Sequence, residues 1–376
     1  MVSLIGKLKK NNQLQGFDIK RVLQVYQNKQ TVRISACKIE EDLAISYACE
    51  KDVREVVEGI LASEIKKGLG SLTSFETSTI SNFSTALNPL NNQYKMVREL
   101  SGHEGLAWSV AVSPSGELIA SASADQTIKI WNEWDTIYTL RGHSNEVKSV
   151  AFSASSEFLI SGSYDETVKV WNANTGEYLR SFDAHSQGVR AVAVSPDNSI
   201  IASCSADKTV STWDVYGKLI STFKGHSGSV NCLAFSDNSK MVVSGSSDKS
   251  VIIWEAESAN VVNELVGHTG SVYSIAWRGS TIASGGYDKM LRVWNSIKGD
   301  SLYAIAGHVK LIRSIDISTC ENYIVTGSET IRVWNNSNLV QRFPESTGVN
   351  SVKFCSENNK IISSHDDCII RIWEFS

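Results

Sequence analysis

The sequence predicts an all-β protein in which one unit of about 40 residues is repeated seven times. The first observation is a tryptophan that recurs every 39 to 42 residues. The second is that the units contain short β-branched runs, such as VKSVAF, FLISGS and TVKVW, separated by Asp, Asn, Gly and Ser. Such runs are typical of strands joined by tight turns. The recurring tryptophans are Trp131, Trp171, Trp213, Trp254, Trp294, Trp334 and Trp373.

Two further positions repeat in phase with the tryptophan. A histidine preceded by Gly or Ala opens six units, and an aspartate stands six residues before the tryptophan in six units. The sixth unit lacks the aspartate, and the seventh opens with the run 343–346 in place of Gly-His. The histidines are His103, His143, His185, His226, His268 and His308, and the aspartates are Asp125, Asp165, Asp207, Asp248, Asp288 and Asp367.

A unit of this length with a Gly-His start and a Trp-Asp end, as in Trp213-Asp214, resembles the WD-repeat (WD40) family. The repeat of that family is one four-stranded blade of a β-propeller. The resemblance implies an all-β, seven-bladed WD-repeat propeller over residues 94–376. A single blade cannot cover both of its faces, so the ring must close. Little chain follows Trp373, and we therefore expect a strand at 94–100 to close the last blade.

The resemblance also implies that the repeat histidine, the turn aspartate, a serine or threonine and the tryptophan form a hydrogen-bonded chain inside each blade. In the second blade the matching residues are His143, Asp165, Ser161 and Trp171. A buried aspartate needs such partners to stay charged. Because the Ser-His-Asp set recurs in several blades and singles out no nucleophile, we interpret it as structural and predict no catalytic residue.

Partner-binding positions follow from the same resemblance. WD-repeat propellers usually bind partners on the face around the narrow end of the channel, through the fifth residue after the repeat histidine and the residue before the turn aspartate. Aromatic and arginine side chains dominate interface energetics, and arginine pairs well with carboxylate or phosphate. We therefore expect this face to bind an extended acidic or phosphorylated protein segment. The candidate partner-binding residues are Trp108, Lys148, Tyr164, Arg190, Tyr273, Tyr287 and Arg313.

The N-terminal part has a different pattern. Residues 1–70 predict a small α+β module, in which three alternating segments precede an amphipathic helix that begins at Asp52. Three strands and one helix resemble the last half of a pleckstrin-homology-like module, which implies that Lys7, Lys9 and Lys10 contact lipid phosphates. The alternative is a helix that packs on the propeller or on a partner chain. Residues 71–93 are rich in Ser, Thr and Asn and predict a linker of low order.

Composition limits the remaining function classes. The formal net charge of −4 does not favour a nucleic-acid-binding protein. The seven cysteines show no paired spacing, so we predict reduced thiols, no metal site and a cytoplasmic, or alternatively nuclear, location. No run is long enough to span a membrane. No nucleotide-binding or zinc-protease motif is present, and we predict neither a cofactor nor an enzyme.

The sequence thus predicts a non-catalytic interaction scaffold or adaptor that belongs to a multiprotein complex. Three alternatives remain open. In the first, residues 1–70 bind lipid and target the adaptor to a membrane. In the second, the chain is a structural subunit of a ubiquitin-ligase, cytoskeletal or ribonucleoprotein assembly. In the third, it is a subunit of an enzyme whose catalysis lies in a partner.

Overall fold

The structure is a computed structural model that describes residues 93–133, 135–343, 347–355 and 359–375. The module expected at 1–70, its pleckstrin-homology-like resemblance and nearly all of the linker lie outside the described residues. The described part belongs to one compact unit that spans Asn92–Ser376. It consists of strands and connecting turns without a helix, so no helix in it could cross a membrane.

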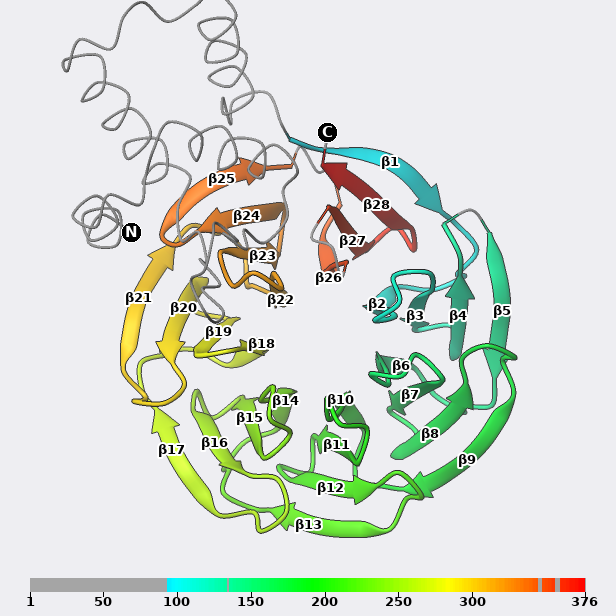
Figure 1. Ribbon diagram of the computed structural model, residues 1–376, viewed down its shortest axis with the longest axis horizontal. Helices are drawn as coiled ribbons and strands as arrows, with labels where there is room; N and C mark the ends of the chain where they lie inside the picture. The colour runs from blue at the N-terminus through cyan, green and yellow to red at the C-terminus, as the bar shows by residue number, and fades with distance from the viewer. Residues whose placement is uncertain (1–92, 134, 344–346, 356–358, 376) are drawn as a thin grey trace, which may run out of the picture. The chain divides into compact units, whose positions relative to one another are not determined.

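Seven four-stranded antiparallel sheets are arranged as blades around a central channel (Figure 1). Within each blade, consecutive strands pair with one another. The innermost strands line the channel: β2 (Ala107–Val112), β6 (Val147–Phe152), β10 (Val189–Val194), β14 (Val230–Phe235), β18 (Val272–Arg278), β22 (Ser314–Ile317) and β26 (Val349–Phe354).

The second strand of each blade is almost completely buried because small and β-branched side chains pack against blades on both sides. The second strands are β3 (Ile119–Ser123), β7 (Phe158–Ser163), β11 (Ile200–Ser205), β15 (Met241–Ser246), β19 (Thr281–Gly286), β23 (Tyr323–Gly327) and β27 (Lys360–His365). The third strands carry the repeat tryptophans and are β4 (Thr127–Trp131), β8 (Thr167–Asn172), β12 (Val210–Asp214), β16 (Val251–Glu255), β20 (Met290–Asn295), β24 (Ile331–Asn335) and β28 (Ile370–Phe375).

The outermost strands form the circumference of the ring. Most of their positions are exposed or only partly buried, as in an edge strand with one solvated side. They are β5 (Thr136–Arg141), β9 (Tyr178–Asp183), β13 (Leu219–Phe223), β17 (Val261–Leu265), β21 (Ser301–Ala306), β25 (Asn338–Arg342) and β1 (Tyr94–Leu100).

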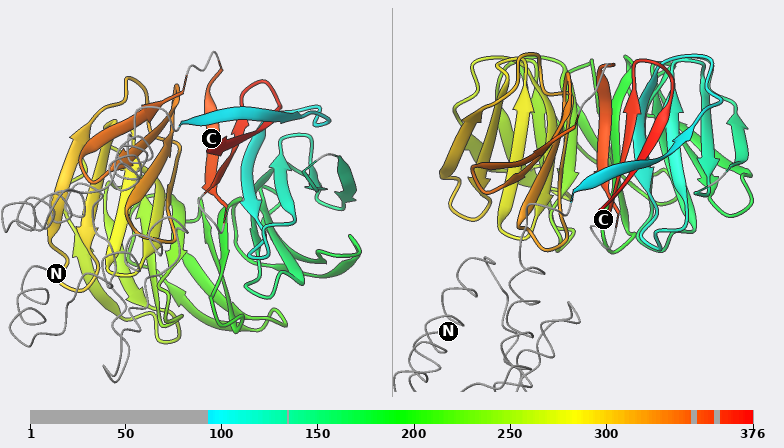
Figure 2. Two further views of the ribbon diagram at one scale, coloured as in Figure 1. Left: turned by 45° about the horizontal axis from the view of Figure 1, so that its top comes forward. Right: turned by 90° about the horizontal axis from the view of Figure 1, so that it is seen from above.

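The outer strand of the last blade comes from the start of the propeller. β1 pairs antiparallel with β28, from Tyr94 opposite Phe375 to Leu100 opposite Ile370. Figure 2 shows the two strands side by side at the C-terminal end. The amide and carbonyl of Tyr94 also bond the side chain of Gln341 on β25, both at 2.8 Å. The two ends of the propeller are therefore held in one sheet, and that sheet is tied to the preceding blade.

The hydrophobic core lies between blades rather than within them. Each buried cluster joins two consecutive blades, and the cluster of Leu100, Trp131 and Ile370 joins the last blade to the first. A second cluster, which includes Val333, Phe343 and Trp373, joins the sixth blade to the seventh. No blade interface in the described propeller is left without apolar packing, which is the physical reason for a closed ring.

A hydrogen-bonded chain crosses each of the first five blades. In the second blade, Asp165 lies 2.7 Å from His143 Nδ1, and His143 Nε2 lies 2.8 Å from Ser161 Oγ, which accepts a bond from Trp171 Nε1 at 2.9 Å. An ionised carboxylate only accepts, so Nδ1 carries the proton and the serine hydroxyl donates to Nε2. Ser161 is fully buried and its oxygen is bonded to both His143 and Trp171, so this hydroxyl is not exposed to solvent. The equivalent residues in the other four blades are His103, Asp125, Ser121 and Trp131; His185, Asp207, Ser203 and Trp213; His226, Asp248, Ser244 and Trp254; His268, Asp288, Ser284 and Trp294.

The hydrogen-bonded chain of side chains has different members in the sixth and seventh blades. In the sixth, Glu329 accepts the amide of Val309 at 3.4 Å, as the aspartates elsewhere accept the amide that follows the histidine, and also the amide of Lys310 at 3.2 Å, but it lies 3.5 Å from His308 Nδ1. In the seventh, Asp367 pairs with Arg371 at 2.7 Å, whereas the other turn aspartates pair with a repeat histidine. The buried His365, which comes from β27 rather than from a Gly-His pair, contacts Ser363 Oγ at 2.8 Å. Trp373 Nε1 donates to the same oxygen.

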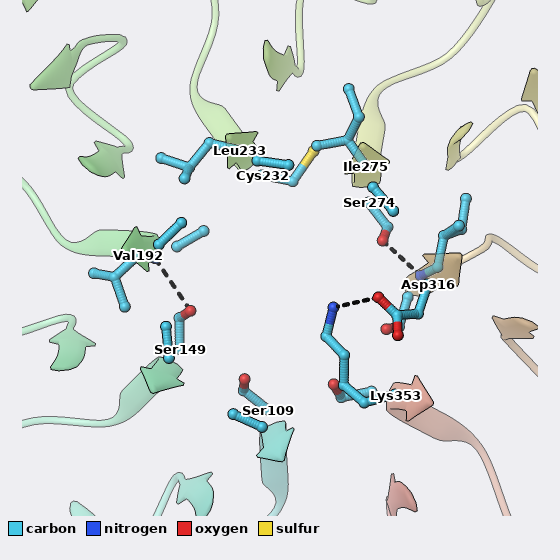
Figure 3. A pocket seen from close by; sticks show the side chains of 18 of the residues that line it. Ser109, Ser149, Val192, Cys232, Leu233, Ser274, Ile275, Asp316 and Lys353 are labelled. Atoms are coloured by element: carbon cyan, nitrogen blue, oxygen red, sulfur yellow. Dashed lines mark hydrogen bonds and ion pairs between the residues drawn. The ribbon is translucent and has the colours of Figure 1, made fainter. Parts of the chain in front are cut away.

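Serines on the inner strands connect neighbouring blades. Ser149 Oγ accepts the amide of Val192 at 3.1 Å, and Ser274 Oγ accepts the amide of Ile315 at 2.7 Å. Figure 3 shows these serines beside the channel. Blade edges are thus joined by hydrogen bonds as well as by apolar packing.

Ser274→Ala is expected to lower the free energy of unfolding by about 1–2 kcal/mol, because the buried amide of Ile315 loses its acceptor. Urea titration of the full chain would measure this. The matched control is Ser301→Ala on the exposed outer strand of the same blade, for which we expect a change below about 0.5 kcal/mol. Equal effects of the two variants would contradict the bridging role of Ser274.

Candidate interaction face

The channel contains a cavity of about 440 Å³. Its lining includes the fifth residue after the repeat histidine in each blade, together with the equivalent residue of the last blade. These residues sit at the start of the inner strands, so seven separate blades place them around one opening. They are Trp108, Lys148, Arg190, Asn231, Tyr273, Arg313 and Asn350.

Trp108, Lys148 and Tyr164 form one cluster at this opening. The Lys148 Nζ atom lies 3.2 Å from the centroid of the Trp108 ring and 4.9 Å from that of Tyr164. Glu146 completes the cluster, because it accepts a hydrogen bond from Trp108 Nε1 at 2.9 Å and lies 3.6 Å from Lys148 Nζ. Glu146 is not among the residues expected from the sequence, although the position three residues after the repeat histidine varies between blades.

The electrostatics of this cluster disfavour a charged lysine. Burial lowers the pKa of Lys148 to about 8, although Glu146 acts in the opposite direction. The positive charges of Arg190 and Arg313 lower the pKa further. Three cationic side chains therefore converge on one opening closely enough to repel one another.

The three cations differ in their partners. Arg313 donates to Asp366 at 2.9 Å and to Asn350 at 2.7 Å, so a carboxylate already neutralises it. Lys148 is balanced by Glu146. Within the described part of the chain, Arg190 has no carboxylate partner, and its buried Nε atom has no hydrogen-bond partner. Arg190 is thus a cation at this opening that no carboxylate of the described residues neutralises.

The two remaining candidates lie apart from the cluster. Tyr273 lines the channel and is half-buried. Tyr287, in the turn between β19 and β20, is 63% exposed and does not line the cavity. The structure therefore brings Trp108, Lys148 and Tyr164 together, whereas Tyr287 stands alone on the surface.

An ion pair lies deeper in the channel. Lys353 on β26 lies 3.0 Å from Asp316 on β22, and the carboxylate also accepts the amide of Phe354 at 2.9 Å. Figure 3 shows the two side chains pointing toward one another across the gap between the sixth and seventh blades. This pair joins the two blades whose internal hydrogen-bonded chains depart from the pattern.

Seven four-stranded blades, the repeated His-Asp-Ser-Trp chain and a channel with a polar opening define a β-propeller of the protein-interaction class. The family model of the WD domain, G-beta repeat (WD40), matches seven consecutive segments, and the chain belongs to this family. The matched segments are 94–132, 134–172, 176–214, 217–255, 259–295, 299–335 and 337–374. WD40 propellers are generally non-catalytic scaffolds that act within complexes.

Similarity to individual curated proteins is confined to short segments. The chain is 45% identical over 42 residues to the probable cytosolic iron-sulfur protein assembly protein Ciao1 of Anopheles gambiae, which covers 11% of this chain and 12% of that protein. It is 51% identical over 39 residues to the pre-mRNA-splicing factor prp46 of Emericella nidulans, which covers 10% and 9%. The chain thus spans about a tenth of these relatives, and such matches reflect a shared repeat.

Proposed function

We propose that this protein is a non-catalytic adaptor of the cytoplasm or nucleus whose channel opening binds an extended acidic or phosphorylated segment of a partner protein. The observation that carries the proposal is the unpartnered Arg190 within a group of three converging cations. A guanidinium without a carboxylate partner is stabilised most by a bound carboxylate or phosphate, with which it can form two parallel hydrogen bonds.

The position of Arg190 explains why a segment rather than a single ion is expected. The guanidinium stands in the third blade, between the Trp108 and Lys148 cluster and the half-buried Tyr273. A segment bound at Arg190 would therefore reach the Trp108 and Lys148 cluster on one side and, beyond Asn231 of the fourth blade, Tyr273 on the other. Arginine and aromatic side chains are the residue types that are enriched in binding hot spots.

A second candidate is a structural subunit of a larger assembly. The observation that favours it is the apolar surface of the outer strands, where Tyr178, Leu219, Val261 and Val340 are each about half exposed. Exposed apolar residues that recur around the circumference fit burial against other subunits. The short matches to assembly and splicing proteins are consistent with a complex subunit.

The proposal is tested by replacing Arg190 with glutamine in the full chain. We expect binding of a peptide that contains glutamate and phosphoserine, measured by fluorescence anisotropy, to weaken about ten- to hundredfold, because one charge-assisted contact is worth roughly 1.5–3 kcal/mol. Arg180→Gln is the matched control, since Arg180 lies on the outer strand β9 and should leave binding unchanged.

Affinity purification from the native cell separates the two candidate functions. If Arg190→Gln removes the copurified proteins and Arg180→Gln retains them, the channel opening carries recruitment. If both variants retain the same stoichiometric partners and neither binds the acidic peptide, the opening is not the binding site, and the outer strands become the interface.

A further inference from the structure

The cluster around Lys148 has the composition of a cation-binding cage. Two aromatic rings, those of Trp108 and Tyr164, face one ammonium group at 3.2 and 4.9 Å, and the carboxylate of Glu146 lies 3.6 Å from it. Aromatic faces and a carboxylate both attract positive charge. In this structure the cation is a lysine of the chain itself.

The walls of the cage are held in place without Lys148. Trp108 is anchored by its hydrogen bond to Glu146. The backbone of Tyr164 donates to the carbonyl of Glu146 at 2.9 Å. Gly188 packs so closely on Tyr164 that a Cβ atom there would lie 2.6 Å from the ring. The cage would therefore keep its shape if the ammonium left, which is the condition for a preformed site.

We propose that Trp108, Tyr164 and Glu146 form a binding site for a methylated ammonium group, and that Lys148 is a built-in occupant which an incoming ligand displaces. This site adjoins the acidic-segment site, because Trp108, Lys148 and Arg190 line the same cavity, but the cage does not include Arg190 and its test does not involve that residue. The ligand has room, because Trp108 and Lys148 also line the 440 Å³ cavity.

Hydration explains why a methylated ammonium can replace the lysine. A primary ammonium is compact and strongly hydrated, so enclosing it costs much of its interaction with water. The lowered pKa of Lys148 reflects that cost. Methyl groups weaken hydration and add apolar contact with the rings, while the charge that the rings and Glu146 attract is kept. Lys148 can return to solvent on its flexible stem.

The test measures binding of tetramethylammonium to the full chain by calorimetry. We expect Lys148→Ala to bind it at least tenfold more tightly than the wild-type protein, because the competing ammonium is removed. Glu146→Gln in the Lys148→Ala background should weaken binding again, and so should Trp108→Leu. Lys169→Ala is the matched control, because Lys169 Nζ lies 5.7 Å from the exposed Tyr178 ring outside the cage. It should behave as the wild type does.

Two further ligands show whether the methylated ammonium group that binds belongs to a protein or to a lipid. A peptide with trimethyl-lysine and vesicles of phosphatidylcholine are each compared with a neutral tert-butyl analogue of the peptide. Binding of either charged ligand by Lys148→Ala, without binding of the neutral analogue, supports the cage and names the source. The proposal is overturned if Lys148→Ala binds tetramethylammonium no more tightly than the wild type, if the neutral analogue binds equally well, or if thermally stable Trp108 and Glu146 variants retain full binding.

Discussion

Replacing Asp165 with alanine is expected to lower the free energy of unfolding by about 3–5 kcal/mol, because it removes one member of a buried polar network and leaves the others unpaired. Asp165 accepts bonds from His143 Nδ1 at 2.7 Å, from the amide of Ser144 at 3.0 Å and from the amide and hydroxyl of Thr167 at 3.0 and 2.7 Å. Burial alone would raise the pKa of Asp165, but these hydrogen bonds outweigh burial and hold the pKa well below its usual value.

The measurement is chemical denaturation of the full chain at pH 7. Asp183→Ala is the matched control, because Asp183 lies exposed on the outer strand of the same blade and carries the same charge. We expect the control to change stability by less than about 0.5 kcal/mol. A comparable loss in both variants would show that the charge itself, rather than the network inside the blade, supports stability.

Stability is expected to fall as the pH is lowered from about 6.5 to 4, because burial favours the neutral form of several histidines, among which the shifts of His308 and His365 are large. Burial, together with repulsion from Arg332, lowers the pKa of His308 to about 4, and burial together with Arg371 does the same for His365. Their folded pKa values lie below the unfolded value, so the unfolded chain binds protons first. At pH 5, His308 and His365 should each lower the free energy of unfolding by about 2 kcal/mol relative to its value at pH 7 or above.

The test is a series of unfolding measurements between pH 7.5 and 4.5, compared with the same series for His365→Asn. Asparagine can still bond Ser363 but does not titrate in this range, so the decline with pH should become less steep, and His308 should account for much of what remains. The network aspartates add little in this window, because a carboxyl with a lowered folded pKa keeps its contribution to stability until the pH falls to its unfolded pKa of 3.8. An unchanged decline would refute the assignment to buried neutral histidines.

The regular part of the fold could be predicted because the repeat places the same physical requirement on many positions. A tryptophan, a turn aspartate and a histidine in phase identify seven blades. The residue after the turn aspartate also takes a positive φ in six blades, 63–76°, which fits a tight turn closed by the aspartate. The His308 and Asp367 positions were harder to interpret, because their partners Glu329 and Arg371 are not the residues of the repeat.

The candidate site could be predicted only as a set of positions. Sequence alignment places Trp108, Lys148 and Arg190 at equivalent points of successive blades, but their contacts cross blade boundaries and carry no local signal. That Lys148 lies on the Trp108 ring, and that Arg190 has no carboxylate partner in the described residues, are results of packing. From the sequence, Lys148, Arg190 and Arg313 are equivalent candidates, whereas in the structure they differ in whether a carboxylate lies beside them.

The sequence by itself thus determined the number of blades, the chain of His, Asp, Ser and Trp within them and the ring of variable positions. These depend on hydrogen bonds within one repeat and on packing between neighbouring repeats, which recur at the same positions of every unit. Only the tertiary structure decided which charges neutralise one another and where a cation is enclosed. Those properties depend on side chains from different blades meeting at one opening, where distances of 3–5 Å determine whether charges are paired.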